Sequence, residues 1–299
     1  MCSHRGMKRR RMIAGLGSVG LCRARGPIQR NGEANLRMGL AAYSLREHFA
    51  WMKGKAQKAK SPAIDMFSFI DFCAQHKVAG AELTSYFFSA NADEAYFRKV
   101  RHHAHLSGVT VSGTAIGNNF SKGRGEHLKK EMTDAKNWID RAVWMGAPHV
   151  RFFAGTAKDF AQKSDHLNVA IEALQECTDY AGRRGVFVGV ENHGNLTASQ
   201  VLEIVKGVDS KWFGVNLDTG NFHSEDPYSD LEKCAPYAIN VQLKTAMKSP
   251  EGKSYPTDFE RISRILKSAK YQGFVTLEYE EKEALKNIPK TLTTLRKYL

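Results

Sequence analysis

The sequence contains few cysteines, and their spacing suggests no pairing. The five are Cys2, Cys22, Cys73, Cys177 and Cys234, and no two of them form a C-x-x-C motif. A zinc ribbon, a thioredoxin-type dithiol and a disulfide framework are therefore not indicated. We expect the thiols to be buried apolar side chains.

Long apolar runs and nucleotide-binding loops are also missing. The apolar stretch Ala14–Cys22 is far too short to span a membrane, so no stable membrane association is expected. Gly15-x-Gly17-x-x-Gly20 has the spelling of a dinucleotide fingerprint, but it follows a run of arginines and no strand precedes it. A doubly wound, dinucleotide-binding sheet is therefore disfavoured.

The positive charge is unevenly distributed. The formal net charge of the chain is +13, but nine Lys or Arg and one Glu precede Met38, so +8 lies in this leader and +5 remains for the rest. A mildly basic body gives no reason to expect nucleic-acid binding, and we predict none.

Residues 1–37 are interpreted as a basic leader. The run Lys8–Arg11 before a short apolar stretch is typical of a twin-arginine export signal, although no clean cleavage site follows. A disordered basic tail is the alternative, and Met7, Met12 and Met38 are all candidate starts. Export to the periplasm and a cytoplasmic location both remain open.

From Met38 to Leu299, short apolar runs alternate with amphipathic segments of helical period. Eight such units over about 260 residues predict a single (β/α)8 TIM barrel. Helices are expected from Ser61-Pro62, over 126–145 before Gly146, and over 281–298. The expected strands lie at 38–43, 78–83, 109–116, 149–153, 187–191, 213–218, 239–244 and 274–280. The pattern leaves the oligomeric state open, including a homo-oligomer.

Four consecutive strands end in oxygen-bearing side chains, which is unusual for purely structural strands. Glu191, Asp218, Gln242 and Glu278 occupy these ends, and a barrel of this kind brings them to one mouth. Hard oxygen ligands suit magnesium or manganese better than zinc, so we predict a divalent metal site. The alternative is a mouth closed by ion pairs, with Lys244 and Arg151 as the counter-ions.

The residues at these strand ends resemble those of the xylose-isomerase-like barrel superfamily. This superfamily contains sugar isomerases and epimerases as well as the family 2 abasic-site endonucleases. The resemblance covers the whole body and is carried by Val190–Gly194, Leu217–Asn221, Val241–Lys244, Leu277–Glu280 and Ala147–Gly155. It implies a metal held by Glu, Asp, His and Glu in chain order. Gln242 stands where that family usually has His, and Asn221 where many epimerases place one.

Both the residues and the resemblance suggest proton transfer through a metal-bound enediolate of a keto-sugar or related polyol. Glu191 and Glu278 are the expected acid and base, because a metal-polarised carbonyl acidifies the neighbouring C–H. The residues expected to contact the substrate are His193, Lys244, Glu82, Asn118, Arg151 and His223.

Three other functions remain. A lyase or dehydratase on a keto-sugar or keto-inositol would use the same proton abstraction. An abasic-site endonuclease needs a histidine-rich cluster of three metals, and the second and third strands offer Glu82 and Asn118 instead. A barrel that binds a sugar without catalysis is the alternative from another class.

Overall fold

Eight parallel strands close into one barrel in the computed structural model, which describes residues 26–299. Their order around the barrel is β1-β12-β9-β8-β7-β6-β5-β4, with β1 pairing β4 to complete the ring. The strands are β1 (Asn35–Ala41), β4 (Gly80–Thr84), β5 (Thr110–Ala115), β6 (His149–Phe152), β7 (Phe187–Glu191), β8 (Phe213–Asp218), β9 (Ala238–Leu243) and β12 (Gln272–Leu277). The predicted TIM barrel is confirmed.

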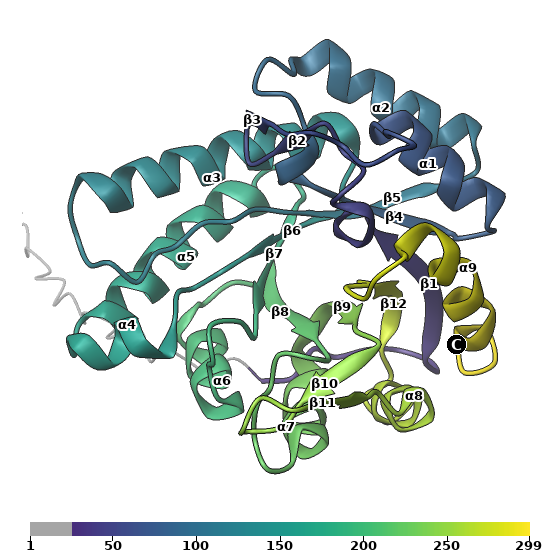
Figure 1. Cartoon of the computed structure of the whole chain (residues 1–299). Coiled ribbons are helices and arrows are strands. Elements are labelled where there is room, and N and C mark those ends of the chain that lie inside the picture. The colour runs from purple at the N-terminus through teal and green to yellow at the C-terminus, as the bar shows by residue number, and fades with distance from the viewer. Residues whose placement is uncertain (1–25) are drawn as a thin grey trace, which may run out of the picture.

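Helices surround the barrel on its outside (Figure 1). They are α1 (Met66–Gln75), α2 (Glu94–Leu106), α3 (Glu126–Met145), α4 (Ala157–Gln162), α5 (His166–Gly182), α6 (Ala198–Gly207), α7 (Pro227–Cys234), α8 (Phe259–Ser268) and α9 (Ala284–Leu295). Because helices cover the outer face and side chains fill the interior, the barrel strands are buried on both faces. Val215 and Asn216 of β8, which point to opposite faces, are both fully buried.

Strand register places the polar strand ends side by side. Glu191 of β7 lies opposite Asn216 of β8, and Asp218 of β8 lies opposite Gln242 of β9. Parallel strands present their C-terminal ends at the same end of a barrel. The register therefore brings these side chains to a common mouth.

Two predicted helix boundaries were wrong. Helix α1 begins at Met66, where the Asp65 carboxylate caps the backbone N–H of Ser68 and the Ser68 hydroxyl caps that of Asp65. This reciprocal capping box satisfies two N–H groups at the start of the helix and so fixes its first turn at Met66. The last helix, α9, covers Ala284–Leu295 and is shorter than predicted at both ends.

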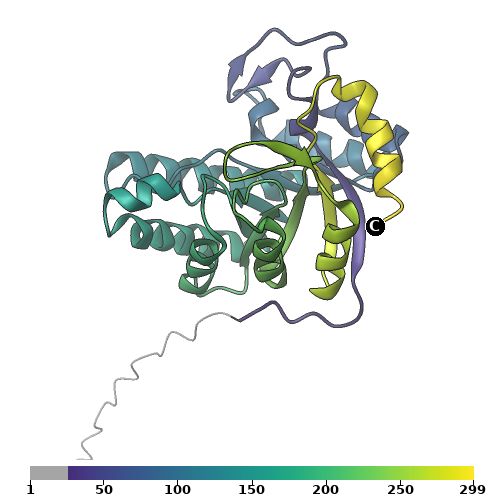
Figure 2. The ribbon, with the colours of Figure 1, turned by 60° about the horizontal axis from the view of Figure 1, so that its bottom comes forward.

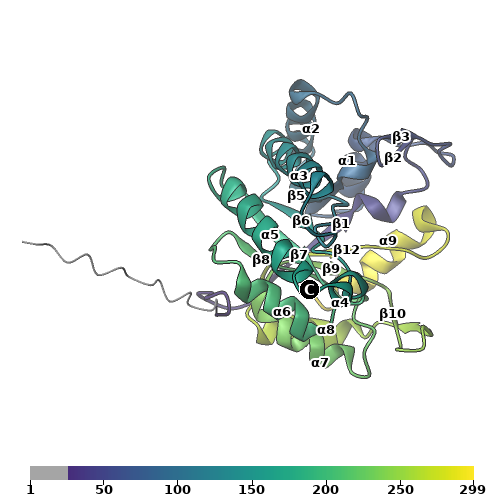
Figure 3. The same ribbon diagram turned by 90° about the vertical axis from the view of Figure 1, so that its left-hand side faces the viewer.

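Two small hairpins project from the connections and were not predicted. Strands β2 (Trp51–Met52) and β3 (Lys55–Ala56) form one, and β10 (Ala246–Lys248) and β11 (Ser254–Pro256) form the other. Figure 3 shows both hairpins on the same side of the molecule. They extend the loops that follow β1 and β9.

The segment before β1 runs beneath the barrel, at the end opposite the β2–β3 hairpin (Figure 2). The Ile28 N–H donates to the Pro236 carbonyl, and the Arg30 guanidinium donates to the carbonyls of Pro236 and Ala238. The first strand begins at Asn35, three residues before the predicted start at Met38. The predicted export signal over Lys8–Arg11 lies outside the described residues.

Candidate active site

The carboxylates at the mouth come from the ends of β7, β8 and β12. Glu191 and Asp218 are the last residues of β7 and β8, and Glu278 directly follows β12. All three are buried. Ionised carboxylates in such surroundings need counter-charges or hydrogen-bond donors, and the mouth supplies both.

The ammonium of Lys244 lies among three of the mouth carboxylates. Its Nζ is 3.0 Å from Glu278 Oε1, 3.1 Å from Glu280 Oε1 and 3.3 Å from Asp218 Oδ2. Burial disfavours the charged lysine, but Asp218, Glu278 and Glu280 outweigh it and raise the pKa of Lys244 well above its ordinary value. The lysine is therefore a permanent cation of the mouth.

The Asp218 carboxylate is only half satisfied by hydrogen bonds. Its Oδ1 accepts from the Gly220 N–H at 2.8 Å, whereas the buried Oδ2 has no hydrogen-bond partner and only the ion pair with Lys244. Burial raises the pKa of Asp218 well above its ordinary value, against the opposing effect of Lys244. This oxygen therefore keeps unused capacity to accept from a donor or a cation.

A second cluster surrounds Glu191. Arg151 Nε lies 2.9 Å from Glu191 Oε2, and the Asn221 side-chain amide donates to Glu191 Oε1 at 2.9 Å. Burial nevertheless raises the pKa of Glu191, although Arg151 acts in the opposite direction. A carboxyl group with a raised pKa is suited to both accepting and returning a proton near neutral pH.

Gln242 belongs to a closed ring of hydrogen bonds inside the barrel. Its amide NH₂ donates to Glu82 Oε1 at 2.7 Å, and its carbonyl oxygen accepts from the Asn216 amide at 2.6 Å. The Asn240 amide donates both to Asn216 Oδ1 at 2.7 Å and to Glu82 Oε2 at 2.9 Å, which closes the ring. All four side chains are buried. The expected role of Gln242 as a metal ligand stays a prediction.

This ring removes Glu82 from the surface of the mouth. Glu82 is fully buried, and burial raises its pKa to about 7, with the Glu278 charge acting in the same direction. Asn118 is likewise engaged elsewhere, because its side-chain amide exchanges two hydrogen bonds with the backbone of Phe153. Both residues were expected to contact the substrate, and in this structure each is occupied by protein partners.

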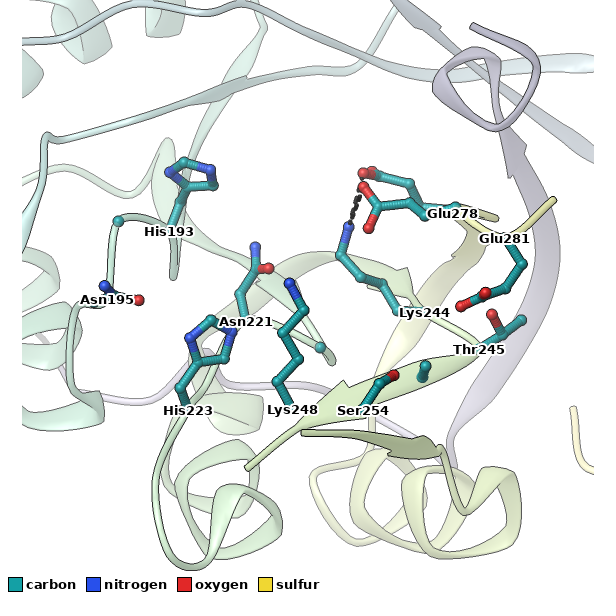
Figure 4. Close-up of a pocket in the computed structure, with 14 residues that line it drawn as sticks. His193, Asn195, Asn221, His223, Lys244, Thr245, Lys248, Ser254, Glu278 and Glu281 are labelled. Carbon is teal, nitrogen blue, oxygen red and sulfur yellow. Dashed lines mark hydrogen bonds and ion pairs between the residues drawn. The ribbon is translucent and has the colours of Figure 1, made fainter. Parts of the chain in front are cut away.

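His193 and His223 line a cavity of about 310 Å³ together with Lys244 and Glu278 (Figure 4). Partial burial, together with the charges of Arg151 and Lys244, lowers the pKa of His193 to about 4, so the ring is neutral at pH 7. Burial and the nearby Lys248 also lower the pKa of His223. Both imidazoles can exchange hydrogen bonds with a bound polar molecule.

Glycine fixes the turn that carries His193. Gly194 has φ +70°, a left-handed conformation that other residues rarely adopt, and a Cβ there would lie 2.8 Å from the Gly155 carbonyl oxygen. The Gly194 carbonyl in turn accepts from the Ala157 N–H at the start of α4. The turn after β7 is thereby held against the loop after β6.

Two charged side chains of the cavity, Glu280 and Lys248, were not given a role by the sequence analysis. Glu280 lies two residues beyond Glu278, and this alternation places both carboxylates on the same side of the extended chain. Lys248 lines the cavity from β10, a strand that the sequence pattern did not predict. The alternation was a usable signal for Glu280, whereas nothing local indicated Lys248.

The described part of the chain contains no ready-made metal cluster. Between residues 26 and 299, no three His, Cys, Asp or Glu side chains are already placed to hold one ion. The donor chemistry nevertheless fits a hard divalent cation, because Glu191, Asp218 and Glu278 come from strand ends at the same mouth and Asp218 Oδ2 has no hydrogen-bond partner. The same residues also include no helix long and apolar enough to cross a membrane.

Comparison with known proteins agrees with this architecture. Residues 70–298 match the family described as xylose isomerase-like TIM barrel. Among curated proteins, an uncharacterized protein of Methanocaldococcus jannaschii is 26% identical over 153 residues, which is 46% of this chain and 50% of that protein. The match thus spans half the length of the curated relative.

Three solved structures share the fold at low sequence identity. A D-psicose 3-epimerase with D-tagatose from Clostridium cellulolyticum has a TM-score of 0.69 at 15% identity, covering 88% of this chain and 99% of its own. A probable 3-DHS dehydratase from Bacillus anthracis has a TM-score of 0.68 at 15% identity, covering 87% and 98%. A Mycobacterium smegmatis barrel in complex with magnesium has a TM-score of 0.64 at 16% identity, covering 88% and 96%. At these identities the likeness is one of fold.

Proposed function

Because this chain belongs to the xylose isomerase-like TIM barrel family, we propose that it is a sugar-modifying isomerase or epimerase that transfers a proton next to a carbonyl group. The observation that carries the proposal is the pair of buried carboxylates, Glu191 and Glu278, at one mouth. Glu278 lines the cavity, and Asn221, which also lines it, hydrogen-bonds Glu191. The fold similarity to a D-psicose 3-epimerase supports the same class of reaction.

The two glutamates would share the proton transfer. One removes the proton from the carbon beside the carbonyl, and the other returns a proton to the carbon skeleton. The raised pKa of Glu191 brings its protonated and ionised forms closer together in energy at neutral pH. The Lys244 ammonium would stabilise negative charge that develops on the substrate oxygen, and neutral His193 would hydrogen-bond a substrate hydroxyl.

A divalent cation, manganese or magnesium rather than zinc, is part of the proposal. Glu191, Asp218 and Glu278 would hold it, with Gln242 as the predicted fourth ligand. When bound, such an ion polarises the substrate carbonyl and its neighbouring hydroxyl, which acidifies the C–H between them. Support comes from the carboxylate donor set and from the fold similarity to a barrel that was solved with magnesium.

The cavity limits the size of the substrate. Its volume of about 310 Å³ is at the lower end of the range for small-molecule sites, which runs from about 300 to 1,000 Å³. Acidic, basic and amide side chains line it, so a polar ligand is favoured over an apolar one. We therefore propose one keto-sugar or polyol unit as the substrate.

The first prediction tests the proton transfer. In D₂O with manganese, the native protein should introduce deuterium at the carbon beside the carbonyl of a ketose such as D-fructose or L-sorbose. Glu191→Gln and Glu278→Gln should each reduce this exchange by about 10²–10⁴-fold, because an amide cannot accept the proton. NMR of the recovered sugars measures the exchange.

The control is Glu203→Gln, which changes an exposed residue of α6 and should leave the exchange unaltered. A native protein that exchanges no proton with a broad panel of keto-sugars and keto-inositols would contradict the enzyme proposal and favour a barrel that only binds a sugar.

A lyase or dehydratase is the second candidate, favoured by the fold similarity to a probable dehydratase. The same glutamates would abstract the proton, and a hydroxyl or alkoxyl group on the next carbon would then leave. Product analysis separates the two reactions, because an epimerase gives a product with the mass of its substrate and a dehydratase gives one lighter by one water.

A further inference from the structure

The position of Lys244 suggests how this site handles a metal ion. We propose that the Lys244 ammonium serves as the cation of the mouth in the metal-free protein, and that an incoming divalent ion displaces it toward Glu280. The inference rests on the metal-binding part of the proposed function. It assigns Lys244 and Glu280 as an exchange pair that sets the affinity of the site.

The ammonium occupies the space that the ion needs. Its Nζ lies 3.0 Å from Glu278 and 3.3 Å from Asp218, two of the three proposed carboxylate ligands. An ion bonded to the same oxygens at about 2.0–2.6 Å would lie within a few ångströms of Nζ. Two cations at such a short distance in a buried site repel each other strongly, so the ion and the ammonium cannot occupy the position together.

The Lys244 ammonium compensates the charge of the surrounding carboxylates only in part, and this favours its exchange for a divalent ion. Asp218 Oδ2 is buried without a hydrogen-bond partner and is the most distant of the three Lys244 contacts. The ammonium brings one positive charge to three carboxylates, Asp218, Glu278 and Glu280. A divalent ion together with a displaced ammonium would balance all three charges.

Glu280 provides the place to which the ammonium moves. Its carboxylate is already 3.1 Å from Nζ, but its side chain is 42% exposed, whereas that of Glu278 is 10% exposed. The four-carbon stem of lysine is flexible, so its head can shift toward the rim while Glu280 keeps it paired.

Manganese titration tests the exchange on the whole protein. Isothermal calorimetry or the electron-spin signal of free Mn²⁺ measures the dissociation constant in native protein and in Lys244→Met. The variant should bind at least about tenfold more tightly, because no ammonium has to be displaced. Lys248→Met is the matched control: it removes the same charge from the same cavity, but Lys248 lies on β10 and should change affinity much less.

Glu280→Gln should weaken manganese binding in the native background, because the displaced ammonium loses its acceptor. Glu281→Gln, a neighbour that also lines the cavity, controls for the loss of a negative charge. In the Lys244→Met background the effect of Glu280→Gln should shrink to that of Glu281→Gln. Such a double-mutant cycle isolates the coupling between Lys244 and Glu280.

Thermal unfolding provides a readout that does not depend on turnover. Without metal, Lys244→Met should melt below the native protein because its carboxylates repel each other, and manganese should raise its melting temperature more than that of the native protein. The inference is overturned if Lys244→Met binds manganese no more tightly than the native protein. It is also overturned if the effects of Lys244→Met and Glu280→Gln on manganese affinity are additive in the double variant. If the two substitutions are coupled in manganese binding but the native protein exchanges no proton of any ketose, the proposed reaction is contradicted and the exchange between Lys244 and the metal ion is still supported.

Discussion

At the scale of single residues, Asn216 makes two hydrogen bonds in the buried ring, as do its other three members. It donates to the Gln242 carbonyl oxygen and accepts from the Asn240 amide, and it is fully buried. Asn216→Ala should lower the free energy of unfolding by about 2–4 kcal/mol, because the buried Gln242 carbonyl oxygen loses its donor and the buried Asn240 amide loses one of its two acceptors. Chemical denaturation measures the change.

Asn168→Ala is the control for this substitution. Asn168 is exposed on α5, where alanine is the better helix former, so the free energy of unfolding should stay the same or rise slightly. Equal losses in the two variants would contradict the structural role of the ring.

The sequence was informative about residues at strand ends and uninformative about residues inside the barrel. Glu191, Asp218 and Glu278 each follow an apolar run, so their common location could be predicted from fold geometry alone. The partners of Gln242 could not be, because Glu82 is 160 positions away in the chain and the contact exists only once the barrel closes. Glu82 was accordingly expected at the mouth.

At the scale of elements, Asp159 joins α4 to the loop that follows β5. It accepts hydrogen bonds from the Lys122 ammonium at 2.7 Å and the Ser121 hydroxyl at 2.8 Å. These bonds, chiefly that from Lys122, lower the pKa of Asp159 to about 2, although burial opposes the shift. The ionised carboxylate therefore stabilises the fold.

Asp159→Asn should reduce the free energy of unfolding by about 1–2 kcal/mol at pH 7, a value discounted because Lys122 is half exposed. Since the pKa is lower in the folded state than its unfolded value of about 3.9, the unfolded chain binds more protons in acid. The difference between native protein and variant should therefore persist above pH 4 and shrink between about pH 4 and pH 2. Urea titrations across this range measure it, with Asp209→Asn on the exposed surface as control.

Helix periodicity predicted the elements better than local start signals did. The helix over 126–145 ends at Gly146, which has φ +74° as a left-handed C-cap requires. Ser61-Pro62 has the composition of a helix start, but the capping box of Asp65 and Ser68 fixes the start four residues later. The two hairpins escaped prediction because strands of two or three residues are too short to show a period.

At the scale of the whole molecule, Arg30 ties the segment before β1 to the start of β9. Its guanidinium donates to the carbonyls of Pro236 and Ala238 and lies over the Tyr271 ring at 5.6 Å. Arg30→Met should lower the free energy of unfolding by about 1–2 kcal/mol, because hydrogen bonds from a partly buried charged group are lost. Arg264→Met, on the exposed surface of α8, is the control.

The barrel itself was predictable because eight repeated strand–helix units are compatible with few other folds. Alternating strands and helices require parallel pairing, and a polar residue at successive strand ends favours a closed mouth over an open sheet. The segment over residues 28–33 was not predicted to join the fold, because its contacts are to backbone carbonyls, which carry no sequence signature.

Closure of the barrel also affects how copies of this chain can associate. Each barrel strand is paired on both sides, so none offers free backbone N–H and C=O groups to a strand from another molecule. Within residues 26–299, outer strand edges belong to the two hairpins, whose strands are two or three residues long. Growth by strand addition, the route by which open sheets aggregate, is therefore largely closed to the folded chain, and any homo-oligomer has to form through the outer helices and loops.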